Sequence, residues 1–299
     1  DTYDLTDSQT HTVAEALIMS TAVPVEEPSG ILYSPRKQGA GSANVYHAMI
    51  SPAYLTAGNG AEQTPKISMG DDDNRTGVYR FSFQVNNLSD REQVYTLDGV
   101  ALTDQVNLDY PGYTFMGETS RALGASVVFS AENGQLPKLY DVNGDGAVDM
   151  TDVQVLLDGV NGLEKLSETV RQDFDLNGDG ILDTADVQIL FEKVSAGFTA
   201  LDVVKVPANG TATVHVTVTL TDADKAYMDE YYENGIYVDG FVRLYAQSED
   251  GVDLSLPFMG FYGNWSDSKV FDIGWYYEGQ DVLCNRYPNV LFTNYGSSY

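Results

Sequence analysis

Apolar and polar side chains alternate along much of this chain. Residues 78–85, 214–220 and 240–245 show this pattern and are rich in Val, Thr, Phe, Tyr and Leu. A period of two is typical of strands with one face in a core. The pattern resumes unchanged after residues 137–198. The sequence therefore predicts one antiparallel β-sandwich, over 66–136 and 199–273, which a different segment interrupts.

The interrupting segment contains an internal repeat. Residues 141–157 read DVNGDGAVDMTDVQVLL and residues 175–191 read DLNGDGILDTADVQILF, with ten of seventeen positions identical at an offset of 34. One helix is expected after each acidic loop, and the apolar pairs at 156–157 and 190–191 suit the packing of these helices on each other. Residues 137–198 are thus predicted to form a small all-α unit.

Each copy of the repeat carries oxygen-bearing side chains at loop positions 1, 3, 5, 9 and 12. They are Asp141, Asn143, Asp145, Asp149 and Asp152 in the first copy and Asp175, Asn177, Asp179, Asp183 and Asp186 in the second. Position 7, which is Ala147 or Ile181, would contribute its main-chain carbonyl, and the glycine at position 6 permits the sharp turn. This pattern predicts an EF-hand-like loop in each copy and two bound calcium ions. An acidic, turn-rich surface is the alternative, but chance rarely produces two such copies in register.

Paired loops followed by one helix each resemble a type I dockerin, the module that attaches enzymes to the cohesins of a cellulosome-like scaffold. The resemblance implies calcium-driven folding and cohesin contacts at positions 10, 11, 17, 18 and 22 of each copy. These positions are Met150, Thr151, Leu157, Asp158 and Gly162, then Thr184, Ala185, Phe191, Glu192 and Ala196. The Ser-Thr pair familiar at positions 10 and 11 is absent from both copies.

The first 52 residues have another texture. A short helix is expected over 12–22, a turn-rich segment follows at 33–41, and a second helix is expected near 44–49. So few apolar residues cannot form a core of their own, so this region is expected to pack on a domain outside this sequence. Arg36 and Gln38 are expected to hold the turn against that missing domain.

The flanks of the repeat carry a second resemblance. LIMSTA at 17–22 with SPRKQGAG at 34–41 is similar to the closing segment of the peptidase domain in lactocepin-type cell-envelope subtilases, and PFMGFYG at 257–263 is similar to the fibronectin-type-III-like domain that follows it. The resemblance implies a mainly β, multidomain chain. Residues 1–52 would be the last helices of an α/β subtilisin-like domain, 66–136 and 199–273 a split fibronectin-III-like sandwich, 137–198 an inserted dockerin, and 274–299 the start of a further domain or a tail.

No residue of this chain is assigned a catalytic role. A subtilase needs an Asp, a His and a nucleophilic Ser. The three histidines, His11, His47 and His215, lack the expected His-Gly-Thr setting. Ser120 lies in a GETS segment that resembles the nucleophile motif only superficially. The resemblance places the nucleophile upstream of Asp1.

The composition limits the classes of partner. The net charge is −28, and no Lys/Arg cluster is present, which disfavours nucleic acid and anionic membranes as partners. Residues 138–200 carry 13 Asp+Glu and 4 Lys+Arg, so part of the acidity is expected to be calcium-ligand charge. A single cysteine, Cys284, rules out a disulfide framework within the chain. No apolar run is long enough to span a bilayer. The two family resemblances imply an extracellular location in a bacterium.

Two functions remain open on these grounds. The first is the non-catalytic part of a secreted subtilisin-like endopeptidase that acts on polypeptides and docks onto a cohesin. The alternative is a non-enzymatic, dockerin-bearing sandwich that binds carbohydrate or protein through aromatic residues such as Trp265 and Trp275. A calcium sensor is a weaker third possibility because Met150 is the only methionine in the repeat unit.

Overall fold

The structure is a computed structural model that describes residues 7–58, 64–108, 115–132, 134–198, 200–248 and 250–267. The chain divides into two units, Asp1–Gly263 and Asn264–Tyr299. The second unit contributes one described element, the short 3₁₀-helix η1 (Trp265–Asp267). The predicted segment 274–299, with Trp275 and Cys284, lies outside the described residues. Among the helices described, none is long and apolar enough to cross a membrane.

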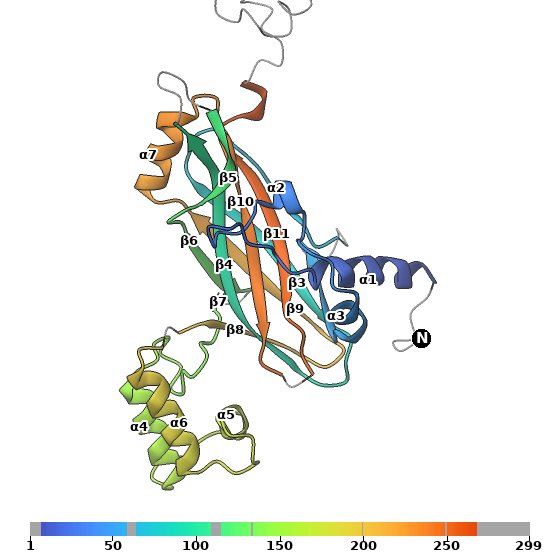
Figure 1. Ribbon diagram of the computed structural model, residues 1–299. Helices are drawn as coiled ribbons and strands as arrows, with labels where there is room; N and C mark the ends of the chain where they lie inside the picture. Colours follow the sequence, from blue (N-terminus) through green and yellow to red (C-terminus); the bar gives the residue numbers. More distant parts are fainter. Residues whose placement is uncertain are drawn as a thin grey trace, which may run out of the picture. The chain divides into compact units, whose positions relative to one another are not determined.

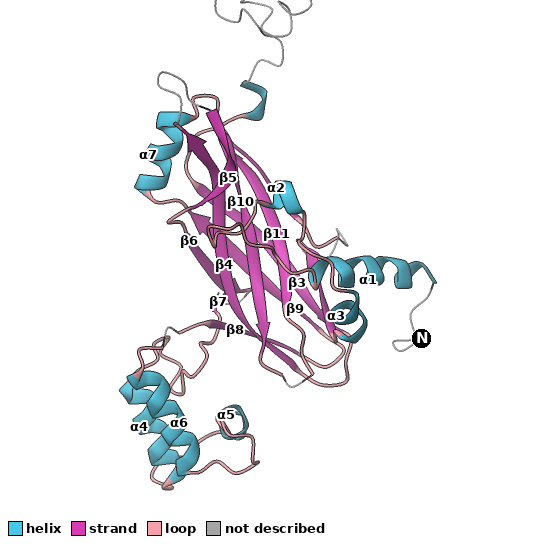
Figure 2. Cartoon of the chain, in the orientation of Figure 1, coloured by secondary structure: helices cyan, strands magenta, loops and turns pink. Residues whose placement is uncertain are grey.

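Two β-sheets form most of the first unit (Figures 1 and 2). One sheet has the order β1-β3-β9-β6-β7 and the other the order β2-β11-β10-β4-β5, with β8 also paired to β4. The strands are β1 (Ala53–Ala57), β2 (Ile67–Asp72), β3 (Val78–Asn87), β4 (Gln93–Asn107), β5 (Phe115–Ala122), β6 (Ser126–Ala131), β7 (Gly134–Gln135), β8 (Asp202–Val206), β9 (Thr211–Thr219), β10 (Ile236–Ala246) and β11 (Leu254–Tyr262). The predicted mainly β sandwich is confirmed. Strand β1 lies before the predicted start of the sandwich at residue 66, yet pairs along its length with β3.

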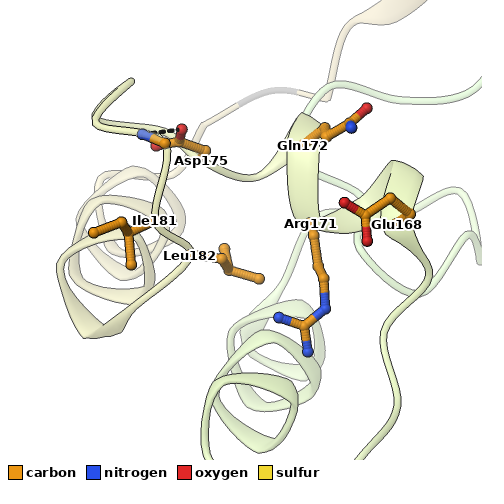
Figure 3. Close-up of a pocket in the computed structure, with 7 residues that line it drawn as sticks. Glu168, Arg171, Gln172, Asp175, Ile181 and Leu182 are labelled. Carbon is orange, nitrogen blue, oxygen red and sulfur yellow. Dashed lines mark hydrogen bonds between the residues drawn. The ribbon is translucent and has the colours of Figure 1, made fainter.

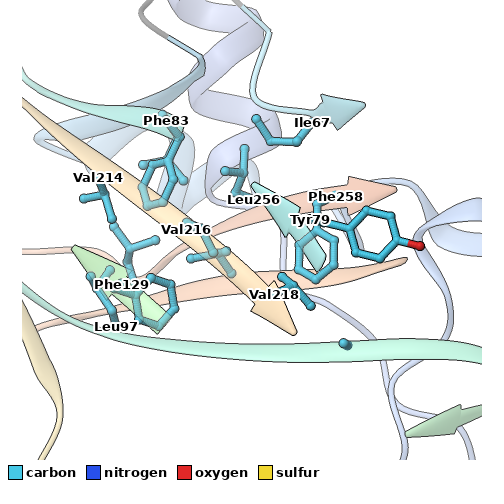
Figure 4. Close-up of a cluster of buried hydrophobic side chains, with 14 of the residues drawn as sticks. Ile67, Tyr79, Phe83, Leu97, Phe129, Val214, Val216, Val218, Leu256 and Phe258 are labelled. Carbon is cyan, nitrogen blue, oxygen red and sulfur yellow. The ribbon is translucent and has the colours of Figure 1, made fainter. Parts of the chain in front are cut away.

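The inner faces of the two sheets share one hydrophobic core (Figure 4). Val214, Val216 and Val218 of β9 alternate with more exposed neighbours, as the period-two pattern predicts. Phe83 of β3 and Leu256 of β11 are also fully buried in this core. At about 25 cal/mol per Å² of apolar surface, contacts of this kind supply most of the driving force for folding of the sandwich.

Strands β10 and β11 are buried on nearly every residue rather than on alternate ones. A second, smaller hydrophobic cluster explains this, because Leu102 of β4 and Phe241 of β10 meet Leu32 from the N-terminal region, and all three are buried. The six-stranded sheet is therefore covered on both faces, which near-continuous apolar strands predict in general.

The N-terminal region packs on the sandwich, so part of its apolar surface is buried within this chain. Val45, Tyr46 and Met49 are nevertheless 65%, 67% and 77% exposed, and the expectation that the region also packs on a domain outside this sequence stays a prediction. Its helices are α1 (Asp7–Ser20), α2 (Pro35–Gln38) and α3 (Val45–Ile50). Ser20 Oγ at the end of α1 accepts the Leu55 amide of β1 at 2.9 Å, and Ser255 of β11 donates to the Ala22 carbonyl at 2.9 Å. The apolar surface that this region covers is the outer face of the six-stranded sheet.

Helix α7 (Asp222–Tyr231) has no counterpart among the predicted elements. Thr221 and Asp224 form a capping box at its start, and Met228 is fully buried against the sandwich core. The TDAD sequence is a recognisable start signal for a helix. Tyr227 and Tyr231 of this helix also pack, partly buried, against the core.

Residues between β7 and β8 form a helical insertion with its own core. Its helices are α4 (Met150–Val160), α5 (Glu168–Asp173) and α6 (Thr184–Ser195). Leu156 and Leu190 are fully buried where α4 and α6 pack, with Phe174 and Leu166 beside them. The two chain segments that lead in and out pair with each other, through a Lys138–Asp202 bridge and the Leu139 N–H to Leu201 carbonyl bond at 2.9 Å.

A matched pair of substitutions tests the sandwich core. Val216→Ala removes two methyl groups from a site that is 1% exposed, and we expect a loss of about 2 kcal/mol in the free energy of unfolding. Val128→Ala makes the same chemical change on the neighbouring strand β6, where the side chain is 55% exposed, and should cost less than about 1 kcal/mol. Denaturant unfolding of both variants measures the difference, and equal losses would contradict the assignment of the inner face.

Candidate metal centre

The two acidic loops of the helical insertion fold in the same way. Asp141 at position 1 accepts the Gly144 and Asp145 amides on Oδ1, at 2.7 and 3.2 Å, and the Gly146 amide on Oδ2 at 2.8 Å. Asp175 repeats each bond in the second copy. The first carboxylate therefore organises the loop by accepting hydrogen bonds from three successive backbone N–H groups.

Glycines at positions 4 and 6 make this turn possible. Gly144 and Gly146 have φ of 75° and 87°, and Gly178 and Gly180 have φ of 72° and 83°. Side chains other than glycine rarely adopt this left-handed region. The glycine at position 6 was predicted from the spacing, and the one at position 4 serves the same purpose.

The side chains at positions 3, 5 and 9 point toward the backbone two residues ahead. Asn143 Oδ1 accepts the Asp145 amide at 2.8 Å, and Asp145 Oδ1 accepts the Ala147 amide at 2.8 Å. Asp149 Oδ1 accepts the Thr151 amide at 2.7 Å, and this bond lowers the pKa of Asp149. The second loop has the same three bonds, made by Asn177, Asp179 and Asp183.

The carboxylate at position 12 is the most buried group of each loop. Asp152 is 0% exposed, and its oxygens accept the amides of Val142 at 2.8 Å, Asn143 at 3.2 Å and Asp149 at 2.8 Å. It forms a capping box with Asp149 at the start of α4, and Asp186 does the same with Asp183 at the start of α6. Position 12 therefore joins the start of the loop to the start of the helix, a role that the ligand pattern alone did not reveal.

The oxygen ligands of the loops suit a hard cation. In this structure, however, the carboxylates accept hydrogen bonds from backbone N–H groups. Oxygen atoms alone stand at the predicted ligand positions, which suits calcium. Within the part of the chain that is described, however, no three carboxylate, imidazole or thiolate groups converge as a metal cluster. A carboxylate offers about four acceptor sites. Asp152 already uses three of them, so one site on its Oδ2 is left for a cation.

The two loops differ in what surrounds them. A pocket of about 630 Å³ lies between α5 and the second loop (Figure 3), and its walls carry Glu168, Arg171 and Gln172 on one side and Asp175, Ile181 and Leu182 on the other. The first loop has no such wall because the helix that precedes it in the repeat is missing, and strand β7 comes before it instead.

The residues predicted to contact a cohesin are all at least partly exposed, and they lie on α4, on α6 or just after them. The list comprises Met150, Thr151, Leu157, Asp158, Gly162, Thr184, Ala185, Phe191, Glu192 and Ala196. Met150 is 52% exposed and Phe191 is 42% exposed. Leu157 is partly buried against the small core of the insertion.

The remaining residues singled out in the sequence have structural surroundings. His11 is exposed on α1, His47 is in α3, and His215 is in the middle of β9. Ser120 is 4% exposed on β5, where its Oγ accepts the Ser34 amide at 3.1 Å. Trp265 is 57% exposed in η1.

The expectation for Arg36 is wrong in its partner. Arg36 donates to Asp239 of β10 at 2.7 Å and to Asp104 of β4 at 2.9 Å, so it holds its turn against the sandwich. Gln38 bonds within its own region, through the Val25 amide at 2.7 Å and the Tyr33 carbonyl at 2.5 Å. Asp104 and Asp239 gave no signal in the sequence beyond a charged residue inside an apolar strand.

Comparisons with known proteins support the sandwich and a distant relationship. Residues 166–259 match the Fn3-like domain family, and within this range lie β8, β9, β10 and most of β11 as well as α5 and α6. The PII-type and PIII-type proteinases of Lactococcus lactis subsp. cremoris and the PII-type proteinase of Lacticaseibacillus paracasei are each 24% identical to this chain over 260 residues. The alignment covers 85% of this chain and 9% of each relative.

Solved structures add no argument beyond this. The PapD-like domain of human CEP192 aligns with 71% of this chain and 83% of its own at a TM-score of 0.28 and 7% identity. A family 123 glycoside hydrolase from Clostridium perfringens aligns with 71% of this chain and 27% of its own at a TM-score of 0.30 and 5% identity. The chain thus contains an Fn3-like domain and has weak homology to lactococcal proteinases.

Removal of the carboxylate at position 12 tests its structural role without any metal. In the presence of chelator, Asp152→Ala should leave three buried or half-buried N–H groups without an acceptor and destabilise the helical insertion by about 2 kcal/mol. Hydrogen exchange at Val142, Asn143 and Asp149 should accelerate by roughly 30-fold. Glu164→Ala, an exposed position of the same insertion, is the control. Unchanged exchange in Asp152→Ala would show that the capping box contributes nothing.

Proposed function

We propose that this chain is the non-catalytic part of a secreted, subtilisin-like cell-envelope serine endopeptidase, and that its Fn3-like sandwich carries an inserted type I dockerin. The homology to lactococcal proteinases supports the first half of the proposal. Residues 1–52 would then be the closing segment of the peptidase domain, and the polypeptide substrate would meet residues outside this sequence. A cell-surface or extracellular location follows from the same relationship.

One observation carries the dockerin proposal: the two loops make the same backbone hydrogen bonds, residue for residue, at an offset of 34. Each loop continues directly into a helix with a capping box, and the two helices pack through Leu156 and Leu190. A surface made acidic only for solubility would have no reason to repeat this geometry.

Calcium would bind to the side chains at positions 1, 3, 5 and 12 of each loop and to the main-chain carbonyl at position 7. These are Asp141, Asn143, Asp145, Asp152 and Ala147 in the first loop and Asp175, Asn177, Asp179, Asp186 and Ile181 in the second. Asp149 and Asp183, at position 9, would complete the two ligand sets. The ion would supply positive charge among four carboxylates per loop that otherwise repel one another.

The partner that fits this module is a cohesin. The side chains at the equivalent positions of α4 and α6 form two similar surfaces. The first carries the exposed Met150 and the partly buried Leu157, and the second carries the exposed Phe191. Such near-symmetry supports binding in either of two orientations. The pocket beside the second loop breaks the symmetry and would favour one of them.

The carbohydrate-binding alternative receives less support from the described residues. Tyr79, Tyr95 and Tyr262 of the strands are buried in the sandwich and offer no ring to a sugar. Trp265 is 57% exposed but belongs to the 3₁₀-helix η1 and not to a strand. We therefore retain the proteinase-associated dockerin as the proposed function.

Calcium titration tests the metal half of the proposal. We expect two equivalents of calcium to bind per chain, with a rise in the thermal stability of the helical insertion, and we expect chelator to reverse it. The double substitution Asp145→Ala with Asp179→Ala should abolish both effects. Asp98→Ala, which removes a carboxylate from β4 of the sandwich, should preserve them. Calorimetry that detects no calcium binding to the intact chain would overturn this half.

Binding to a purified type I cohesin tests the partner. Leu157→Ala together with Phe191→Ala should weaken calcium-dependent binding by at least tenfold, because each orientation loses its apolar contact. Leu163→Ala is the matched control, since this leucine is 78% exposed in the same insertion but belongs to neither surface. Equal binding in calcium and in excess chelator would contradict a dockerin.

The gene sequence upstream of Asp1 tests the peptidase half. We expect its reading frame to encode the Asp, His and Ser motifs of a subtilase, in that order. A reading frame that begins without these motifs would leave the sandwich unattached to a proteinase.

A further inference from the structure

A buried polar cluster lies where the N-terminal region meets the outer face of the six-stranded sheet. Arg36 of α2 donates from Nε to Asp239 Oδ2 of β10 at 2.7 Å and from Nη2 to Asp104 Oδ1 of β4 at 2.9 Å. Ser34 Oγ also donates to Asp239 Oδ2. These contacts join residues more than sixty positions apart in the sequence and border the cluster of Leu32, Leu102 and Phe241.

The carboxylates of this cluster are deeply buried and incompletely paired. Asp239 is 0% exposed and Asp104 is 2% exposed. Asp239 Oδ1 and Asp104 Oδ2 are each buried without a hydrogen-bond partner in the described part of the chain. Glu27 nearby is 4% exposed, with Oε1 accepting the Ser120 amide at 2.8 Å and Oε2 unpartnered.

The charges of the cluster do not balance. Arg36 contributes one positive charge to two carboxylates, so full ionisation would bury a net negative charge at the contact. Burial of an uncompensated charge costs several kcal/mol unless the group takes up a proton. Burial accordingly raises the pKa of Asp239, and the Arg36 guanidinium opposes only part of that rise.

Two further charged groups lie around the cluster, the Glu27 carboxylate and the Arg121 guanidinium, and their opposite charges leave the excess of one negative charge unchanged. Tyr237 of β10 lies under the Arg36 guanidinium at 4.5 Å. The hydroxyls of Tyr227 on α7 and of Tyr232 just after it both donate to the Asp104 main-chain carbonyl, at 3.0 and 3.1 Å. Arg121 of β5 stacks on the Tyr227 ring at 4.1 Å. The β11 residue paired with Asp239 is Met259, which carries no charge.

We propose that Asp104, Asp239 and Arg36 form a proton-operated latch, which holds residues 31–42 firmly on the sheet when one carboxyl group is protonated and loosens them when both are ionised. Protonation leaves one carboxylate for one guanidinium. It also supplies an O–H donor inside a site that now has unpartnered acceptor oxygens.

The sign of the pH dependence follows from linkage. A carboxyl group whose pKa is higher in the closed state than in the open state binds a proton on closing, so closing is favoured as the pH falls. The latch is tightest below the ordinary Asp pKa of 3.8 and weakens as the pH rises from there through the raised value. One proton allows at most a tenfold change in the opening equilibrium per pH unit.

Hydrogen exchange of the intact chain between pH 4 and pH 8 tests the latch. After correction for intrinsic exchange rates, protection of the amides in 31–42 should fall with rising pH, by up to tenfold per unit where the carboxyl titrates. Asp239→Asn and Asp104→Asn each leave a neutral amide of the same shape and one carboxylate for Arg36, so they should remove this slope. Asp98→Asn is the matched control, because Asp98 also pairs with an arginine, Arg243, but is 38% exposed.

A second measurement keeps the proposal falsifiable if a variant folds poorly. The ¹³C carboxyl resonance of Asp239 in the unsubstituted chain should titrate above the ordinary Asp pKa of 3.8. Protection that does not vary with pH, or a slope that survives in both Asn variants, would overturn the latch. An Asp239 carboxyl resonance that titrates at or below 3.8 would overturn it equally.

Discussion

The contact between the N-terminal region and the outer face of the six-stranded sheet is the constraint on which the rest of the first unit depends. It buries Leu102 and Phe241, which would otherwise be apolar residues on an exposed face. The same region satisfies edge strands: Ser20 accepts the Leu55 amide of β1, and Glu27 accepts the Ser120 amide of β5. Sheet edges with free N–H groups invite pairing with other chains. The region thus covers part of the outer face of the six-stranded sheet and supplies one hydrogen-bond acceptor at an edge strand of each sheet.

The local pattern of the sequence predicted the strands well because alternation depends only on neighbouring residues. Val214, Val216 and Val218 are buried as their period of two requires. The covering of β10 could not be foreseen in this way, since it depends on Leu32, some two hundred positions away. Residues 236–246 carry only two charged side chains, Asp239 and Arg243, whereas a strand with one solvent-exposed face alternates more strictly, so this segment did contain a signal.

The loops of the insertion were more predictable than their detailed bonding. The spacing of Asp141, Asn143 and Asp145 located each turn, and the glycines with positive φ stand where the spacing requires them. The capping role of Asp152 escaped notice because a ligand pattern and a capping box use the same residue type at the same place. The partner of Arg36 escaped notice because two aspartates within apolar strands have meaning only once β4 and β10 are side by side.

The bridge between Lys138 and Asp202 joins the two chain segments that enter and leave the helical insertion. It therefore limits the effect of the insertion on the stability of the sandwich. When the insertion is folded, its two ends lie close together. The entropy cost of connecting β7 to β8 is then similar to that of a tight turn. If the insertion unfolds, the same connection becomes a flexible loop of about 60 residues. Loop-closure entropy grows only with the logarithm of length, so the difference amounts to about 2.5 kcal/mol. The sandwich can therefore host a module whose folding is conditional and remain assembled while that module is unfolded.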